Sequence, residues 1–211
     1  EQLLALDRHY FAAWPRVSNA RFVGVDTSAP AINYALGVGL LVGGVTTDLE
    51  RNDPTPEDCA TLANTDLIIS TGCVGYVTER TFRKILDCRR GGRPPIVASF
   101  VLRMYSYDEV EKELNRVGLV TEKLDAVTFV QRRFSSTAEF ESTLSRLDDM
   151  GIDPAGKEAD GLLHAELYVS RTPEQMAERP LGDLVSVTSG EAQTRGRRFK
   201  LVQDNRTEFV H

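Results

Sequence analysis

The segment Phe22-Val-Gly-Val-Asp26-Thr-Ser-Ala-Pro30 limits most strongly what this chain can fold into. Residues 21–25 are a short, mostly apolar run closed by an acid, which is typical of a buried strand in a parallel sheet. Ser28 is predicted to cap the next helix, with Pro30 in its first turn. This arrangement places the carboxylate of Asp26 at the carboxyl edge of a sheet, where open α/β folds bind ligands.

The rest of the chain continues the alternation of strands and helices. Further strands are predicted at 45–48, 66–70, 96–102, 119–124, 127–134 and 162–169, and helices at 3–14, 57–63, 78–86, 107–117 and 137–150. The helix after Ser28 is expected to fade at Gly43-Gly44. The alternation predicts an α/β fold with a three-layer, Rossmann-like, mostly parallel sheet. The late strand–helix–strand group adds one antiparallel C-terminal strand.

Composition limits the classes of protein and partner. The 211 residues are 41% hydrophobic, which fits one domain at 1–171, and a polar C-terminal extension at 172–211 contains Arg195–Lys200 and two short strands. No run of 18 apolar residues predicts a membrane span. The net charge of −6 disfavours a nucleic-acid partner.

Cysteine and histidine usage bears on the compartment and on metals. Cys59, Cys73 and Cys88 are odd in number and widely spaced, which predicts neither a disulfide framework nor a zinc site. A reducing cytoplasm is the simplest compartment. With three histidines in the chain, no histidine-rich metal site is expected.

Two acids follow the first two predicted strands. Asp26 can accept hydrogen bonds from the vicinal hydroxyls of a ribose, or it can cap the next helix. Asp48 can accept a hydrogen bond from an adenine amino group while Leu49 packs on the ring. The alternative for Asp48 is a turn acid on the surface.

Later strand ends carry further candidates. The turn Ser70-Thr-Gly-Cys-Val-Gly-Tyr76 has two glycines, which let the backbone approach a ligand closely, and Tyr76 could face a substrate. Cys73 is expected to be buried and inert. Arg103 and Tyr105 could bind a polar or acidic substrate, and the alternative for Arg103 is an ion pair with an acid such as Asp108. His164 and Glu166 share one strand face, as an acid–base pair or as edge residues without a catalytic role.

Taken together, these segments resemble the class I S-adenosylmethionine (SAM)-dependent methyltransferases. The resemblance rests on the run from Phe22 to Ala35, on Asp48-Leu49, on Asp66–Gly72, and on the order of the late elements, and it covers about residues 20–170. It implies SAM as cofactor, with Asp26 and Thr27 at its ribose and Asp48 and Leu49 at its adenine. Ser70, Thr71 and Gly72 would face the methyl donor, and Tyr76, Arg103 and Tyr105 the substrate.

One family element is missing from these residues. Nothing between Glu1 and Val25 fits the first strand and its glycine-rich loop, and we expect an upstream segment to supply both.

The resemblance implies methyl transfer to a small-molecule acceptor. Such a reaction depends on alignment more than on acid–base groups, so no catalytic residue is assigned and no metal is expected. One alternative is a non-catalytic Rossmann-like binding or scaffold module, and another is a nicotinamide-dependent oxidoreductase. The sequence leaves a homo-oligomer open.

Overall fold

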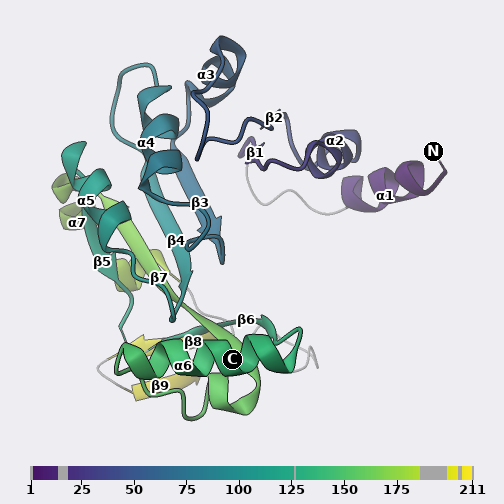
Figure 1. Cartoon of the computed structure of the whole chain (residues 1–211). Coiled ribbons are helices and arrows are strands. Elements are labelled where there is room, and N and C mark those ends of the chain that lie inside the picture. The colour runs from purple at the N-terminus through teal and green to yellow at the C-terminus, as the bar shows by residue number, and fades with distance from the viewer. Residues whose placement is uncertain (1, 14–18, 126, 186–198, 204–205, 211) are drawn as a thin grey trace. The chain divides into compact units, whose positions relative to one another are not determined.

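The computed structural model describes residues 2–13, 19–125, 127–185, 199–203 and 206–210, the last two ranges as backbone (Figure 1). Its contacts divide the chain into two compact units. Unit 1 comprises Glu1–Thr65 with Val77–Arg93, and unit 2 comprises Asp66–Tyr76 with Pro94–His211. No helix among the described residues has the length and apolar character needed to cross a bilayer.

Unit 1 carries a small parallel sheet and four helices. They are α1 (Gln2–Ala12), β1 (Val23–Val25), α2 (Ala29–Gly37), β2 (Gly43–Val45), α3 (Pro56–Leu62) and α4 (Glu79–Asp87). Strands β1 and β2 pair in parallel, as the first strand–helix segment predicted. Ser28 caps α2 as predicted, because its hydroxyl accepts the N–H of Ala31 at 3.4 Å.

The end predicted for α2 is wrong. The helix stops at Gly37, and Gly43 and Gly44 belong to β2. A Cβ on Gly44 would lie 2.3 Å from Cγ2 of Ile32, a buried residue of α2. The glycine therefore lets the helix pack directly against the strand, a tertiary contact that the local sequence does not reveal.

The start of α4 is anchored by one carboxylate of unit 1. Glu50 accepts hydrogen bonds from the backbone N–H of Thr78 at 2.8 Å, from its hydroxyl at 2.7 Å, and from the hydroxyl of Thr81 at 2.5 Å. Burial raises the pKa of Glu50, but the hydrogen bonds from Thr81 and Thr78 outweigh it and hold that pKa below its ordinary value. Glu50 thus joins the turn after β2 to α4.

A disulfide closes the other end of α4. Cys59 in α3 is bonded to Cys88 at the C-cap of α4, 29 residues later in the chain. The prediction of no disulfide was wrong for this pair. The spacing of the cysteines in the sequence does not reveal that α3 lies beside the end of α4. A hydrogen bond from Arg89 Nε to the carbonyl of Thr65 (2.7 Å) lies at the same junction.

Unit 2 is built on a larger sheet. Its elements are β3 (Leu67–Thr71), β4 (Ile96–Leu102), α5 (Asp108–Arg116), β5 (Val120–Lys123), β6 (Phe129–Arg133), α6 (Thr137–Asp149), η1 (Glu158–Asp160), β7 (Leu162–Arg171), α7 (Pro173–Glu178), α8 (Leu181–Leu184), β8 (Phe199–Gln203) and β9 (Arg206–Val210). The hydrogen-bonded order is β3-β4-β7-β5, and β6 pairs with β7 as well.

The directions of these strands confirm the predicted α/β class and the antiparallel C-terminal strand. Strands β3 and β4 are parallel, whereas β7 is antiparallel to β4, β5 and β6. Figure 1 shows the long β7 with β6 beside its first half and β5 beside its second half. Because β3 and β4 are parallel, the turns that follow them leave the same edge of the sheet.

The first part of the C-terminal extension, which includes α8, packs on this sheet. Leu181 of α8 joins Leu167 and Val169 of β7 in one apolar cluster. The buried Arg171 pairs with Glu122 of β5 and donates to the carbonyl of Arg179 at 2.6 Å. The expected pair of short strands is present as β8 and β9, while residues 195–198 of the basic run lie outside the described residues. The predicted boundary between 171 and 172 stays a prediction.

Candidate functional site

Asp26 directly follows β1 at the carboxyl edge of the small sheet. Its backbone N–H donates to the carbonyl of Val45 at 3.1 Å, which fixes it beside the end of β2. Its Oδ1 accepts the N–H of Ser28 at 2.7 Å, and the residue is exposed. Within the described residues Oδ2 has no hydrogen-bond partner. The structural use of Asp26 at the helix start therefore leaves one carboxylate oxygen available, and the adjacent Thr27 is exposed as well.

Asp48 lies three residues beyond β2 in a turn and does not end the strand as predicted. Its Oδ1 accepts the N–H of Glu50 at 3.0 Å, and its Oδ2 is 3.7 Å from Nε of Arg51. Leu49 is buried, with 3% of its surface exposed. The carboxylate thus remains at the same edge as Asp26, while the Leu49 side chain is directed into the protein.

The turn after β3 is tied to β4. Ser70 Oγ donates to Ser99 Oγ at 2.9 Å, and the N–H of Gly72 donates to the carbonyl of Phe100 at 2.8 Å. Gly72 has φ of +63°, a conformation that favours glycine. A Cβ there would lie 3.6 Å from Oε1 of Gln131, so β6 lies beside this turn. Thr71 is exposed.

Tyr105, a predicted substrate contact, is held in a close packing arrangement. A Cβ on Gly75 would lie 2.6–2.8 Å from atoms of the Tyr105 ring, and Gly75 has φ of +121°. The guanidinium carbon of Arg146 lies 4.8 Å from the ring centroid. The structure thus joins the turn after β3, the turn after β4 and α6. Tyr76, the other predicted aromatic contact, is 71% exposed.

Arg103 is already paired within the protein. Its Nη1 lies 2.5 Å from Oε2 of Glu158, and its Nη2 donates to the carbonyl of Asp153 at 2.8 Å. Both members of the ion pair are buried, and the acid is Glu158 and not Asp108. Arg103 therefore fastens the loop before β7 to the end of β4.

A buried hydroxyl network behind the β3 turn was missed by sequence reasoning. Ser99 Oγ lies 2.9 Å from the hydroxyl of Tyr107, and both residues are buried. Burial raises the pKa of Tyr107 to about 12. A serine within the otherwise apolar strand 96–102 was the signal available in the sequence. Burial likewise raises the pKa of the half-buried Cys73 thiol, which fits the expectation of an inert cysteine.

His164 and Glu166, the candidate acid–base pair of β7, each interact with another residue of the protein. His164 Nδ1 lies 2.9 Å from Thr128 Oγ1, whereas Glu166 pairs with Lys123 at 2.7 Å, so the two residues on one face of β7 do not act on each other. No cluster of three or more histidine, cysteine or acidic residues suited to a metal occurs in the described part of the chain.

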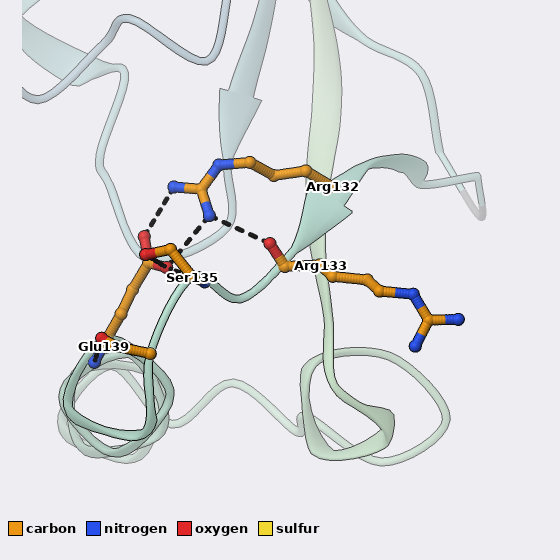
Figure 2. A network of polar contacts seen from close by, with 5 residues as sticks. Arg132, Arg133, Ser135 and Glu139 are labelled. Carbon is orange, nitrogen blue, oxygen red and sulfur yellow. Dashed lines mark hydrogen bonds and ion pairs between the residues drawn. The ribbon is translucent and has the colours of Figure 1, made fainter.

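A second polar network organises the start of α6 (Figure 2). Arg132 donates to both carboxylate oxygens of Glu139, at 3.0 and 2.6 Å, and Glu139 also accepts the N–H and hydroxyl of Ser135. These hydrogen bonds lower the pKa of Glu139 to about 2. Arg132 also donates to the backbone carbonyl of Arg133 at 3.0 Å, while Figure 2 shows the side chain of Arg133 directed away from this network. Sequence reasoning did not identify it, since its partners are seven residues apart across a turn.

The comparisons with known proteins include a likeness of low TM-score to a solved structure. No model of a known protein family matches the chain, and no curated protein matches it. A solved structure of the plantazolicin methyltransferase BpumL, in complex with a triazolic desmethylPZN analog and SAH, is similar with a TM-score of 0.37 at 13% sequence identity. The similarity covers 72% of this chain and 68% of that one. A likeness of this size assigns neither a cofactor nor a substrate to this chain.

Proposed function

We propose that this chain belongs to a SAM-dependent methyltransferase that acts on a small-molecule acceptor. The observation that supports the proposal is the carboxyl edge of the parallel pair β1–β2. Asp26 follows one strand directly and Asp48 lies in the turn after the other. Acids at the ends of neighbouring parallel strands are suited to the hydroxyls of a ribose and to the amino group of an adenine.

The proposed role of Asp26 fits its geometry. Oδ1 accepts the N–H of Ser28, the N-cap residue of α2, and Oδ2 is left to accept a hydrogen bond from a ribose hydroxyl. Thr27 would lie at the same ribose. The carboxylate of Asp48 would accept from the adenine amino group. Because Leu49 is buried, the backbone beside it and not its side chain would meet the ring.

The methyltransferase resemblance assigns Ser70, Thr71 and Gly72, in the turn after β3, to the methyl donor; the proposal itself rests on the carboxyl edge of β1–β2 alone. Tyr76 and Tyr105 are the proposed acceptor contacts. Arg103 would contribute indirectly, since its guanidinium is engaged by Glu158 and holds the end of β4.

The cofactor supplies an activated methyl group on a sulfonium. Asp26 and Asp48 would hold this cofactor, and it would supply the methyl that the acceptor receives. The residues of the chain then need to orient the acceptor and exclude water. Such a reaction would need little acid–base machinery from the chain.

The test is calorimetry with S-adenosylhomocysteine on the full-length protein. Asp26→Asn keeps an oxygen for the Ser28 N–H and removes the charge, so the turn before α2 is kept while ribose binding weakens by about tenfold or more. Asp87→Asn, an exposed acid of the same unit, is the matched control and should bind as the wild type does. Absence of binding at millimolar ligand would sink the proposal, as would equal affinities of the two variants.

A non-catalytic Rossmann-like module is the second candidate. It is favoured by the hydrogen bond from the Ser28 N–H to Asp26 Oδ1 in the turn before α2, which accounts for an acid at this position without any ligand. Under this alternative Asp26→Asn changes neither ligand binding nor stability, and no S-adenosylhomocysteine binds.

A further inference from the structure

Arg146 of α6 is a cation without an acidic partner among the described residues. Its guanidinium carbon lies 4.8 Å from the centroid of the Tyr105 ring. Asp149 lies one turn further along α6, yet no ion pair joins the two residues. Glu139, on the same helix, is taken by both terminal nitrogens of Arg132. The guanidinium is therefore directed to an aromatic ring and not to a carboxylate.

The ring beneath Arg146 is fixed in place. Tyr105 follows β4 in a turn closed by its N–H to the carbonyl of Leu102 at 2.9 Å. Its ring occupies the space that a side chain at Gly75 would need. On the core side Tyr105 packs against the buried cluster of Leu102, Leu163 and Ala165. Packing on both sides thus fixes the Tyr105 ring that Arg146 contacts.

The position of this stack is that of a ligand site. The turns after β3 and β4 leave the same edge of a parallel pair, which is where open α/β sheets bind ligands. Gly75 belongs to the first turn and Tyr105 to the second. The stack of Arg146 on Tyr105 therefore stands beside the residues proposed to contact the acceptor.

The chemistry of a stacked arginine defines the ligand. An aromatic ring engages the face of the guanidinium and leaves its N–H edge free. Two parallel N–H groups on that edge match the two oxygens of a carboxylate. Elsewhere in unit 2, Arg103, Arg132 and Arg171 each pair with a carboxylate of the protein, whereas Arg146 and the exposed Arg133 have no such partner among the described residues, and of these two Arg146 lies against an aromatic ring.

We propose that Arg146, held on Tyr105, binds the carboxylate of a small organic acid. Resting on the function proposed above, this identifies the acceptor as a molecule that carries a carboxylate. Anion binding by Arg146 itself does not require that function. Carboxylate and phosphate can both accept two parallel N–H bonds from a guanidinium, so the experiment below includes inorganic phosphate to separate the two.

The experiment uses 4-fluorobenzoate and its neutral counterpart 4-fluorobenzamide, titrated into the intact chain and followed by ¹⁹F NMR. We expect millimolar binding of the benzoate, weakened about tenfold in Arg146→Gln. The benzamide should bind at least about tenfold more weakly than the benzoate. Arg133→Gln is the matched control, because Arg133 is exposed in the same unit and points away from the network of Figure 2. Both variants remove one positive charge.

Several outcomes overturn the inference. They are no binding of benzoate to the wild type, equal binding of benzoate and benzamide, equal losses in the two arginine variants, or tighter binding of inorganic phosphate than of benzoate. S-adenosylhomocysteine binding is measured on the same Arg146→Gln sample and should be unchanged. If benzoate needs Arg146 while no sample binds S-adenosylhomocysteine, the proposed function fails and the carboxylate site stands. The reverse result rejects the site alone.

Discussion

The ion pair between Arg103 and Glu158 yields a quantitative prediction for unit 2. The side chains are 7% and 1% exposed, and Nη1 lies 2.5 Å from Oε2. Glu158→Ala leaves a buried guanidinium whose described partner is the carbonyl of Asp153. Removing one member of a buried pair costs about 3–5 kcal/mol, and we expect about 3 kcal/mol because the bond to Asp153 persists.

Urea unfolding followed by circular dichroism measures this cost. With a denaturant slope of about 2 kcal/mol per molar urea, the midpoint should fall by about 1.5 M. Glu109→Ala is the control, since it breaks an ion pair with Lys112 in which both side chains are 69% exposed, and it should leave the midpoint unchanged. The double variant Arg103→Met with Glu158→Met should lie closer to the wild type than Glu158→Ala, because no charge is left buried.

Two results would refute this reasoning. One is a midpoint for Glu158→Ala equal to that of Glu109→Ala. The other is a double variant less stable than Glu158→Ala, which would mean that shape and not charge decides the cost. Hydrogen exchange in residues 153–164 gives an independent reading, because loss of the Arg103 contact should speed exchange there first.

Three further perturbations have defined outcomes. Gly75→Ala should lower the thermal midpoint of unfolding, because the backbone conformation costs about 1–2 kcal/mol and the new Cβ overlaps the Tyr105 ring. In a Tyr105→Ala background, the part of the destabilisation caused by that overlap should vanish. The pKa of Glu139 is lowered from its ordinary 4.5 to about 2 by Arg132, so its contribution to the stability of the folded state is complete above pH 4.5 and is lost as the pH falls toward 2. Glu139→Gln should therefore make the free energy of unfolding depend less on pH in that window. An unchanged pH profile would contradict the ion pair. Cys59→Ser should destabilise the oxidised protein by about 3–4 kcal/mol, for a loop closed over 29 residues, and should abolish the effect of a reducing agent on the melting temperature.

Consecutive residues determined the local elements of this protein. The cap Ser28 and the bounds of β4 (Ile96–Leu102) follow from short patterns, because caps and hydrophobic periodicity act over a few residues. Asp26 was placed at a strand end for the same reason. Whether it binds a ribose stays a prediction, since the same carboxylate also accepts the N–H of Ser28 in the turn before α2.

Only the tertiary structure decided which distant groups meet. Gly44 lies in a strand because α2 packs on it, and Cys59 reaches Cys88 because α3 lies beside the end of α4. Arg103 finds Glu158 across 55 residues, which changed a predicted substrate contact into an internal ion pair. These contacts depend on the turns that bring distant segments together and on which side chains are buried against each other. A short stretch of sequence determines neither.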